Sequence, residues 1–334
     1  MTLLRYTGKR FLILVPQLIV IVTLVFFLIR LLPANPVSRI VGLNPTPEAI
    51  AQAKRSLGID KSVWVQFGDY VKGLLHGSLD TSWVTHGSIV HEIWEHFPIT
   101  IQLMVMSFGI ALLIAIPLGM ITAARPGGKL DRSLFVYGLF AGSQPDFWWG
   151  LAFVFLLVFK LHIFPIPQGL DPGTTVHTVT GFDMVDSLIT GNLDAFVTLF
   201  GQYLLPSLTM AFVLSGPIVK MVRQNMLRFR DANFLMYARA NGLGRGKIAS
   251  YTMRNALSPV VTLVGILFGF EIGGAVLIEQ VFSLNGLGQY AVQRTLQLDY
   301  PAIQGVVLTM TAFGLLVYLA MDLLYTVIDP RIKY

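Results

Sequence analysis

The sequence predicts an all-α membrane protein that crosses the bilayer several times, with six transmembrane helices. Its composition is 54% hydrophobic and only 13% charged, whereas soluble domains carry about 25% charged residues. A membrane-spanning helix needs about 20 predominantly apolar residues. Windows of that length without Asp, Glu, Lys or Arg occur at residues 11–29, 97–124, 195–219 and 300–321. These windows predict four of the six spans.

Two further windows, residues 133–159 and 255–282, have spanning length but contain acidic residues. Asp146 lies in the first, and Glu271 and Glu279 lie in the second. We count both windows as spans, which gives the total of six. The first apolar run is longer than the core of a secretory signal and no small-residue cleavage pattern follows it, so we expect it to remain as an anchor.

The basic residues predict how the helices are oriented in the membrane. Most of the 24 Lys and Arg residues lie in segments 1–10, 124–133, 220–254 and 328–334. These segments fall on one side of a six-span chain, and the positive-inside rule places that side, with both termini, in the cytoplasm. The net charge of +6 therefore reflects topology, and a nucleic-acid partner is not expected.

Three regions follow from this topology: residues 1–32 hold the amino terminus and first span, residues 33–96 lie outside, and residues 97–330 form a five-span core. In the external region, Thr46 as N-cap, Pro47 in the first turn and Gly58 after the end predict one helix. Apolar spacing from residue 63 to residue 74 predicts a second helix. This small helical cap either packs on the spans or docks a soluble partner. Residues 161–194 contain many Pro and Gly residues and are expected to form an external loop.

The cytoplasmic segment around residues 231–247 mixes apolar and basic side chains. Asp231 can cap a short helix that runs to Asn241, and Gly242 suits the left-handed residue after a helix. Such a helix is too short to be stable alone, so packing must hold it. It can dock another protein, or it can lie on anionic lipid headgroups.

The familiar catalytic signatures are missing. His91 and His96 are five residues apart, which does not match the spacing of a helical zinc motif. Gly246-Lys247 lacks the Ser or Thr of a phosphate-binding loop, and no Gly-x-Ser-x-Gly nucleophile motif occurs. We therefore expect no catalytic, cofactor-binding or metal-ligating residue in this chain, and any ATP must be hydrolysed by a partner.

Over nearly its whole length the sequence resembles the inner-membrane permeases of binding-protein-dependent ABC importers, in the oligopeptide, dipeptide and nickel group. The motifs that carry the resemblance are Lys9-Arg10, Leu31-Leu32-Pro33 with Pro36-Val37, Leu57-Gly58-Ile59-Asp60, Gly77-Ser78-Leu79, Pro145 with Phe147-Trp148, Ala238-Arg239-Ala240-Asn241-Gly242-Leu243, Arg254-Asn255-Ala256-Leu257 with Pro259, and Asp322-Leu323-Leu324-Tyr325 to Asp329-Pro330-Arg331. Two positions depart from the usual pattern: Asn285 replaces the proline of Pro-Gly-Leu-Gly, and Asp146 stands where the family often has a small uncharged residue.

The resemblance implies a type I ABC importer permease fold in a bacterial or archaeal cytoplasmic membrane. The implied partners are a second permease chain, two ATPase subunits that bind ATP and Mg, an external solute-binding protein and membrane lipid. It also implies that the cytoplasmic loop, about residues 220–258, inserts into the ATPase. The residues assigned to that docking are Tyr237, Ala238, Arg239, Ala240, Gly242 and Leu243.

Charged groups inside a membrane are costly and therefore often functional. We expect Asp146 and Glu271 to line the translocation pathway, with Asp146 contacting a positive group on the solute. Glu279 lies near the outer end of its span and is expected to cap backbone groups of the 283–290 turn. An ATP-independent secondary transporter or channel is the alternative, although the two halves show no inverted repeat. The sequence does not choose among dipeptides, longer peptides, nickel chelates and oligosaccharides.

Overall fold

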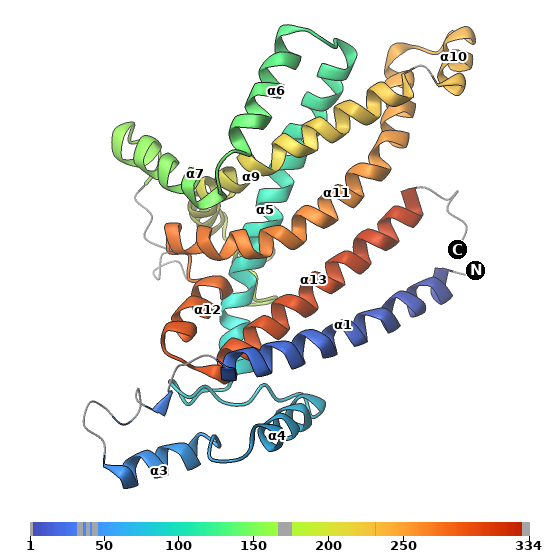
Figure 1. The fold of residues 1–334 in the computed structure, drawn as a ribbon. Helices are drawn as coiled ribbons and strands as arrows, with labels where there is room; N and C mark the ends of the chain where they lie inside the picture. Colours follow the sequence, from blue (N-terminus) through green and yellow to red (C-terminus); the bar gives the residue numbers. More distant parts are fainter. Residues whose placement is uncertain are drawn as a thin grey trace.

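The computed structural model describes residues 3–31, 36–37, 41, 46–165, 176–230 and 232–328. Over these residues the chain is helical and contains no strand, only a bridge between Thr81 and Ser88. The helices, labelled as in Figure 1, are α1 (Leu3–Leu31), α3 (Pro47–Ser56), α4 (Val63–Leu75), α5 (Ile89–Ala124), α6 (Lys129–Ala141), α7 (Asp146–Phe153), η1 (Val154–Lys160), α8 (Asp183–Ile189), α9 (Leu193–Phe229), α10 (Asn233–Ala240), α11 (Arg245–Phe282), α12 (Leu287–Leu296) and α13 (Tyr300–Ile328).

Five helices are long and apolar enough to cross a membrane. They are Phe11–Leu31, Ile89–Ala124, Leu193–Phe229, Gly246–Phe282 and Tyr300–Leu324. They include all four charge-free windows and the acidic window at residues 255–282. The prediction of a multi-pass all-α membrane protein is therefore confirmed for these spans.

The predicted span at residues 133–159 is not one continuous helix. It divides into α6, α7 and the π-helical segment η1, with a break between Ala141 and Asp146. Pro145 has no backbone N–H to continue the α6 ladder. The indole Nε1 of Trp149 donates to the carbonyl oxygen of Ala141 at 3.0 Å, so a backbone group freed at the break is satisfied. The apolar window at residues 133–159 identified the apolar residues correctly, but hydropathy alone does not reveal this interruption of the helix.

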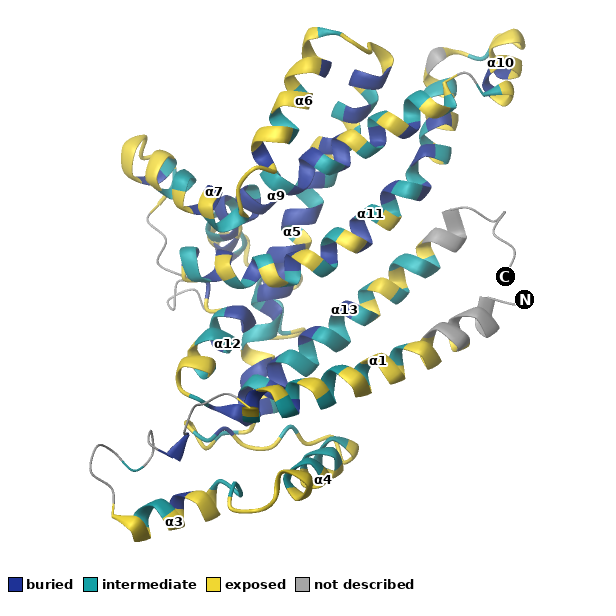
Figure 2. Ribbon diagram, in the orientation of Figure 1, coloured by how far each residue is buried: buried dark blue, intermediate teal, exposed yellow. Residues whose placement is uncertain are grey.

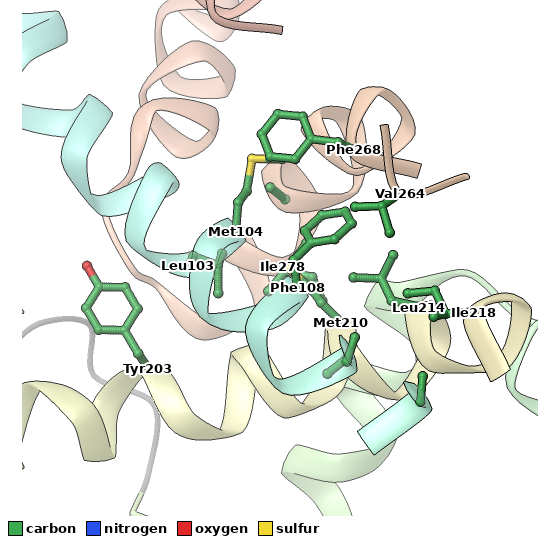
Figure 3. Packing of buried hydrophobic residues seen from close by; sticks show 14 of the residues in the cluster. Leu103, Met104, Phe108, Tyr203, Met210, Leu214, Ile218, Val264, Phe268 and Ile278 are labelled. Carbon is green, nitrogen blue, oxygen red and sulfur yellow. The ribbon is translucent and has the colours of Figure 1, made fainter. Parts of the chain in front are cut away.

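The core lies where α5, α9 and α11 meet, and α5 packs along much of α9. Figure 3 shows the interdigitated side chains: Leu103, Met104 and Phe108 from α5; Met210, Leu214 and Ile218 from α9; and Val264, Phe268 and Ile278 from α11. By contrast α1, which packs beside α13, exposes many apolar side chains (Figure 2). A peripheral helix with an exposed apolar surface fits contact with lipid.

Both helices of the predicted cap form where the sequence indicates. The Thr46 hydroxyl oxygen accepts a hydrogen bond from the backbone N–H of Ala49 at 3.2 Å, which is the expected N-cap of α3. Gly58 and Gly77 follow α3 and α4 with φ of 66° and 75°, a left-handed conformation that glycine adopts without a steric penalty.

The cap helix α4 is fastened to the end of α1. The ring of Phe26 lies 5.1 Å from that of Phe67 and 5.5 Å from that of Tyr70, measured between centroids. Arg30 Nε donates to Gln66 Oε1 at 2.9 Å. These contacts support the first interpretation of the cap, in which it packs on the spans.

Residues 161–194 are not entirely loop, because α8 forms within them. Its Asp186 carboxylate accepts hydrogen bonds from the backbone N–H groups of Val179, Thr180 and Gly181. Burial opposes ionisation of Asp186, but these bonds and one from the Thr180 hydroxyl outweigh it and lower the pKa to about 2. A seven-residue helix held by a single carboxylate is too short for periodicity to reveal.

Candidate functional site

The short helix α10 is carried at the far ends of two long helices. α9 has 37 residues and α11 has 38, so each is about 55 Å long, whereas the hydrocarbon core is about 30 Å thick. Figure 1 shows α10 at the tip of this pair, at the opposite end of the molecule from α3, α4 and α12. The excess length of α9 and α11 therefore projects α10 away from the apolar core.

The ends of α10 explain how so short a helix is fixed. It begins at Asn233, with Ala232 at the N-cap position. Asp231, which we expected to cap this helix, lies outside the described residues. At its other end, the Gly242 N–H donates to the Arg239 carbonyl oxygen at 3.0 Å and the Leu243 N–H to that of Ala238 at 3.1 Å. Gly242 has a φ of 73°, which confirms its predicted left-handed role.

The predicted docking residues differ in how they are exposed. Tyr237 is 74% exposed, and Arg239, Ala240 and Gly242 are also exposed. Leu243 is half-buried. Ala238 is buried, so it contributes mainly to the packing of the helix.

Beside α10 lies an open groove with a volume of about 490 Å³. It is lined by Phe234, Tyr237, Ala238, Asn241 and Leu243, together with Tyr251 and Asn255 from α11. The last two were missed by the sequence analysis, because only the turn between α10 and α11 brings them to the same surface. An aromatic-edged groove of this kind can accept an apolar side chain from another protein.

A second candidate site joins the two acidic residues assigned to the pathway. Asp146 is the first residue of α7, and Glu271 lies on α11, where it is buried. Both side chains converge on Gly274: a Cβ placed there would lie 2.9 Å from Glu271 Oε2 and 3.0 Å from Asp146 Oδ2. The structure thus brings together two carboxyl groups that are far apart in sequence.

The pair is polar and incompletely satisfied. Within the described part of the chain, Glu271 Oε2 is buried and has no hydrogen-bond partner. Two carboxylates this close repel each other, so a cation beside them is stabilised. Gly274 keeps the space above the two oxygens open, and the sequence analysis had not singled it out.

Glu279 has the structural role that the sequence predicts. Its side chain is completely buried. Glu279 Oε2 accepts a hydrogen bond from the N–H of Gln289 at 2.8 Å, in the first turn of α12, and Oε1 accepts one from Thr100 Oγ1 at 2.5 Å. A Cβ at Gly286 would lie 2.5 Å from Glu279 Oε1, so glycine there leaves room for the carboxylate.

Comparison with known proteins agrees with this architecture. The family model described as "Binding-protein-dependent transport system inner membrane component" matches residues 115–334, and the model of its amino-terminal region matches residues 3–104.

Individual relatives cover nearly the whole chain. A dipeptide transport system permease protein from Alkalihalophilus pseudofirmus is 33% identical over 99% of this chain and 100% of its own length. A probable D,D-dipeptide transport system permease protein from Escherichia coli is 36% identical over 92% of this chain and 91% of its own. A di/tripeptide transport system permease protein from Pseudomonas aeruginosa is 31% identical over 99% of both chains.

These matches confirm the resemblance seen in the sequence motifs, and they make the chain a transport component and not an enzyme. Two family models together account for most of the chain, and its spanning helices fit a membrane component. The chain belongs to the family of inner membrane components of binding-protein-dependent transport systems.

Proposed function

We propose that this chain is one of two permease subunits of an ATP-driven importer, that its solute is a di- or oligopeptide, and that α10 docks on the ATPase. The observation that carries the proposal is full-length similarity to permeases whose names concern dipeptides and di- or tripeptides. The further partners are a second permease, two ATPase chains that bind ATP and Mg, an external solute-binding protein and lipid. Family membership favours this function over an ATP-independent transporter or channel.

The proposed topology has six crossings. α6, α7 and η1 together form the third crossing, which is interrupted at residues 142–145. With this crossing included, successive crossings run through the membrane in opposite directions. Both termini, the α5–α6 connection and α10 face the cytoplasm, because the basic segments then lie inside. The cap formed by α3 and α4 then lies outside, toward the solute-binding protein.

Coupling uses the exposed side of α10. Tyr237 and Leu243 line the groove. Gly242 and Arg239 are exposed on the same segment, and Arg239 adds a positive charge to it. ATP-driven closure of the two ATPases moves the paired α10 helices together, and the long helices α9 and α11 carry that motion into the spans. This is rigid-body alternating access between two states.

The Asp146–Glu271 pair lies in the pathway and holds the protonated amino terminus of the peptide. A buried carboxyl pair with an unsatisfied oxygen is complementary to an ammonium group, which offers three hydrogen-bond donors and one positive charge. The binding protein selects solutes, and the pair then provides a weak transient site from which the solute can leave.

The docking proposal is tested by purification in mild detergent followed by mass spectrometry of the co-purifying chains. A second permease and ATPase chains are expected with the unmodified protein, and Tyr237→Asp should lose the ATPases. Met236→Asp is the matched control, because Met236 is 56% exposed on the same helix but does not line the groove. Equal ATPase recovery with both variants would refute docking through this groove.

The pathway proposal is tested by transport into proteoliposomes of the assembled importer. Asp146→Asn and Glu271→Gln should slow uptake of a peptide with a free amino terminus more than uptake of its N-acetylated form. Unchanged uptake of both peptides would exclude the carboxyl pair from the pathway, and an equal loss for both would assign it a structural role.

A further inference from the structure

A pocket of about 640 Å³ lies between α6 and α9, away from both sites described above. Its lining is mostly apolar along α6, with Leu134, Phe135, Val136 and Leu139. Phe135, Val136 and Leu139 are each more than 60% exposed, so the pocket opens to the surroundings of the helix and is not sealed within the core.

Two contacts hold α6 and α9 in place around this pocket. The helices approach closely at Gly138 and Gly216, where a Cβ on Gly216 would lie 3.2 Å from the Cα of Gly138. Arg223 also forms a two-pronged ion pair with Asp131, with Nη2 donating to Oδ2 at 2.8 Å. Because residues from both contacts line the pocket, its shape is fixed by the packing and does not depend on an occupant.

The charged residues of the pocket leave an excess of positive charge at one end. Asp131 pairs with Arg223, whose guanidinium lowers the pKa of that carboxyl and keeps it ionised. Arg132 and Lys220 also line the pocket and are exposed, and no carboxylate pairs with them in the described part of the chain. Two cations without a carboxylate partner among the described residues therefore lie beside the apolar lining of the pocket.

We propose that this pocket binds an anionic phospholipid, with its phosphate between Arg132 and Lys220 and an acyl chain along the apolar lining. Basic pockets between transmembrane helices are suited to such headgroups, and two basic residues add to the hydrophobic attraction of the chain. An apolar protein helix fits less well, because it would bury the two cations without partners. This inference goes beyond the proposed function, since neither ATPase coupling nor solute recognition requires it.

The test is native mass spectrometry of the full chain with its co-purifying subunits, titrated in micelles with phosphatidylglycerol or phosphatidylcholine. The unmodified chain should retain phosphatidylglycerol preferentially. The double variant Arg132→Gln, Lys220→Gln should lose about 30-fold in affinity for it, which corresponds to about 1 kcal/mol for each of two basic residues. Val136→Trp, which fills the pocket without changing charge, should lower retention of the lipid as well.

The matched control is the double variant Arg125→Gln, Lys129→Gln. It removes the same amount of charge, from the α5–α6 connection and the first residue of α6, but neither residue lines the pocket. An equal loss in both double variants would overturn the proposal in favour of general attraction to anionic lipid. No preference for phosphatidylglycerol in the unmodified chain would also overturn it.

A second measurement identifies the occupant directly. The chain contains no cysteine, so Val136→Cys provides a single thiol for a benzophenone maleimide. After irradiation of native membranes, an adduct with the mass of a phospholipid supports the proposal. An adduct with a protein chain would assign the pocket to a subunit interface instead, and the absence of any adduct would indicate an unoccupied pocket.

Discussion

Replacing Glu279 with alanine should destabilise the packing of α12 against α5 and α11 by about 3 kcal/mol. The carboxylate is completely buried and accepts from Thr100 Oγ1 and from the N–H of Gln289. Alanine removes both acceptors, and each buried donor left without a partner costs about 1–3 kcal/mol. Thr100 Oγ1 also accepts from the N–H of Leu287 at 2.8 Å. Without Glu279 the Thr100 hydroxyl is no longer held in place, and the start of α12 is weakened further. Glu279→Gln retains one acceptor oxygen and should lose about half as much.

The measurement is equilibrium unfolding of the purified full chain in mixed micelles, titrated with dodecyl sulfate and followed by circular dichroism. Glu95→Ala serves as the control, because this carboxylate is on α5 but is 56% exposed, and among the described residues it pairs only with His91. It should change the free energy of unfolding by less than about 0.5 kcal/mol. If Glu279→Ala and Glu95→Ala unfold alike, the carboxylate does not hold α12, and our explanation of its burial is wrong.

Three further predictions concern contacts at the helix ends and crossings. Arg223→Gln should cost about 1 kcal/mol of stability. Because Arg223 lowers the pKa of Asp131, the ion pair contributes at neutral pH and is lost as pH falls through that lowered value. This dependence should be weaker in the variant in pH-resolved unfolding, where only the hydrogen bond from the Gly127 N–H still favours the ionised carboxyl. Asp186, with a pKa of about 2, should protect backbone amides 179–181 from hydrogen exchange above about pH 4, with protection lost toward pH 2. In Asp186→Asn, which keeps one acceptor oxygen but does not titrate, the protection should be weaker and independent of pH. Gly216→Val should cost about 1–3 kcal/mol by overpacking against Gly138, and an unchanged unfolding midpoint would mean that α6 and α9 do not touch there.

Much of the fold could be predicted because its signals are local. Each long span is recognisable as an apolar window in the sequence. The cap helices have their own start and stop residues, such as Thr46 and Gly58. Gly242 was recognised for the same reason, since a left-handed residue after a helix favours glycine wherever the helix lies. These features depend on a few neighbouring residues.

The candidate sites were predicted only in part. The exposed residues of α10 followed from the sequence motif, but the groove wall formed by Tyr251 and Asn255 depends on how α11 turns back beside α10. The burial of Ala238 likewise depends on packing and could not be read from its position in the motif.

The sequence by itself determined the class of the protein, the positions of its apolar windows and the identity of the charged residues within them. Hydrophobic length and helix-end chemistry are properties of the chain alone, which is why they survive without tertiary information. The tertiary structure decided where the window at residues 133–159 breaks and which partners its charged residues meet. Asp146 and Glu271 converge on Gly274 only because the break redirects α7 against α11, and contacts between distant segments are set by packing, which no local pattern encodes.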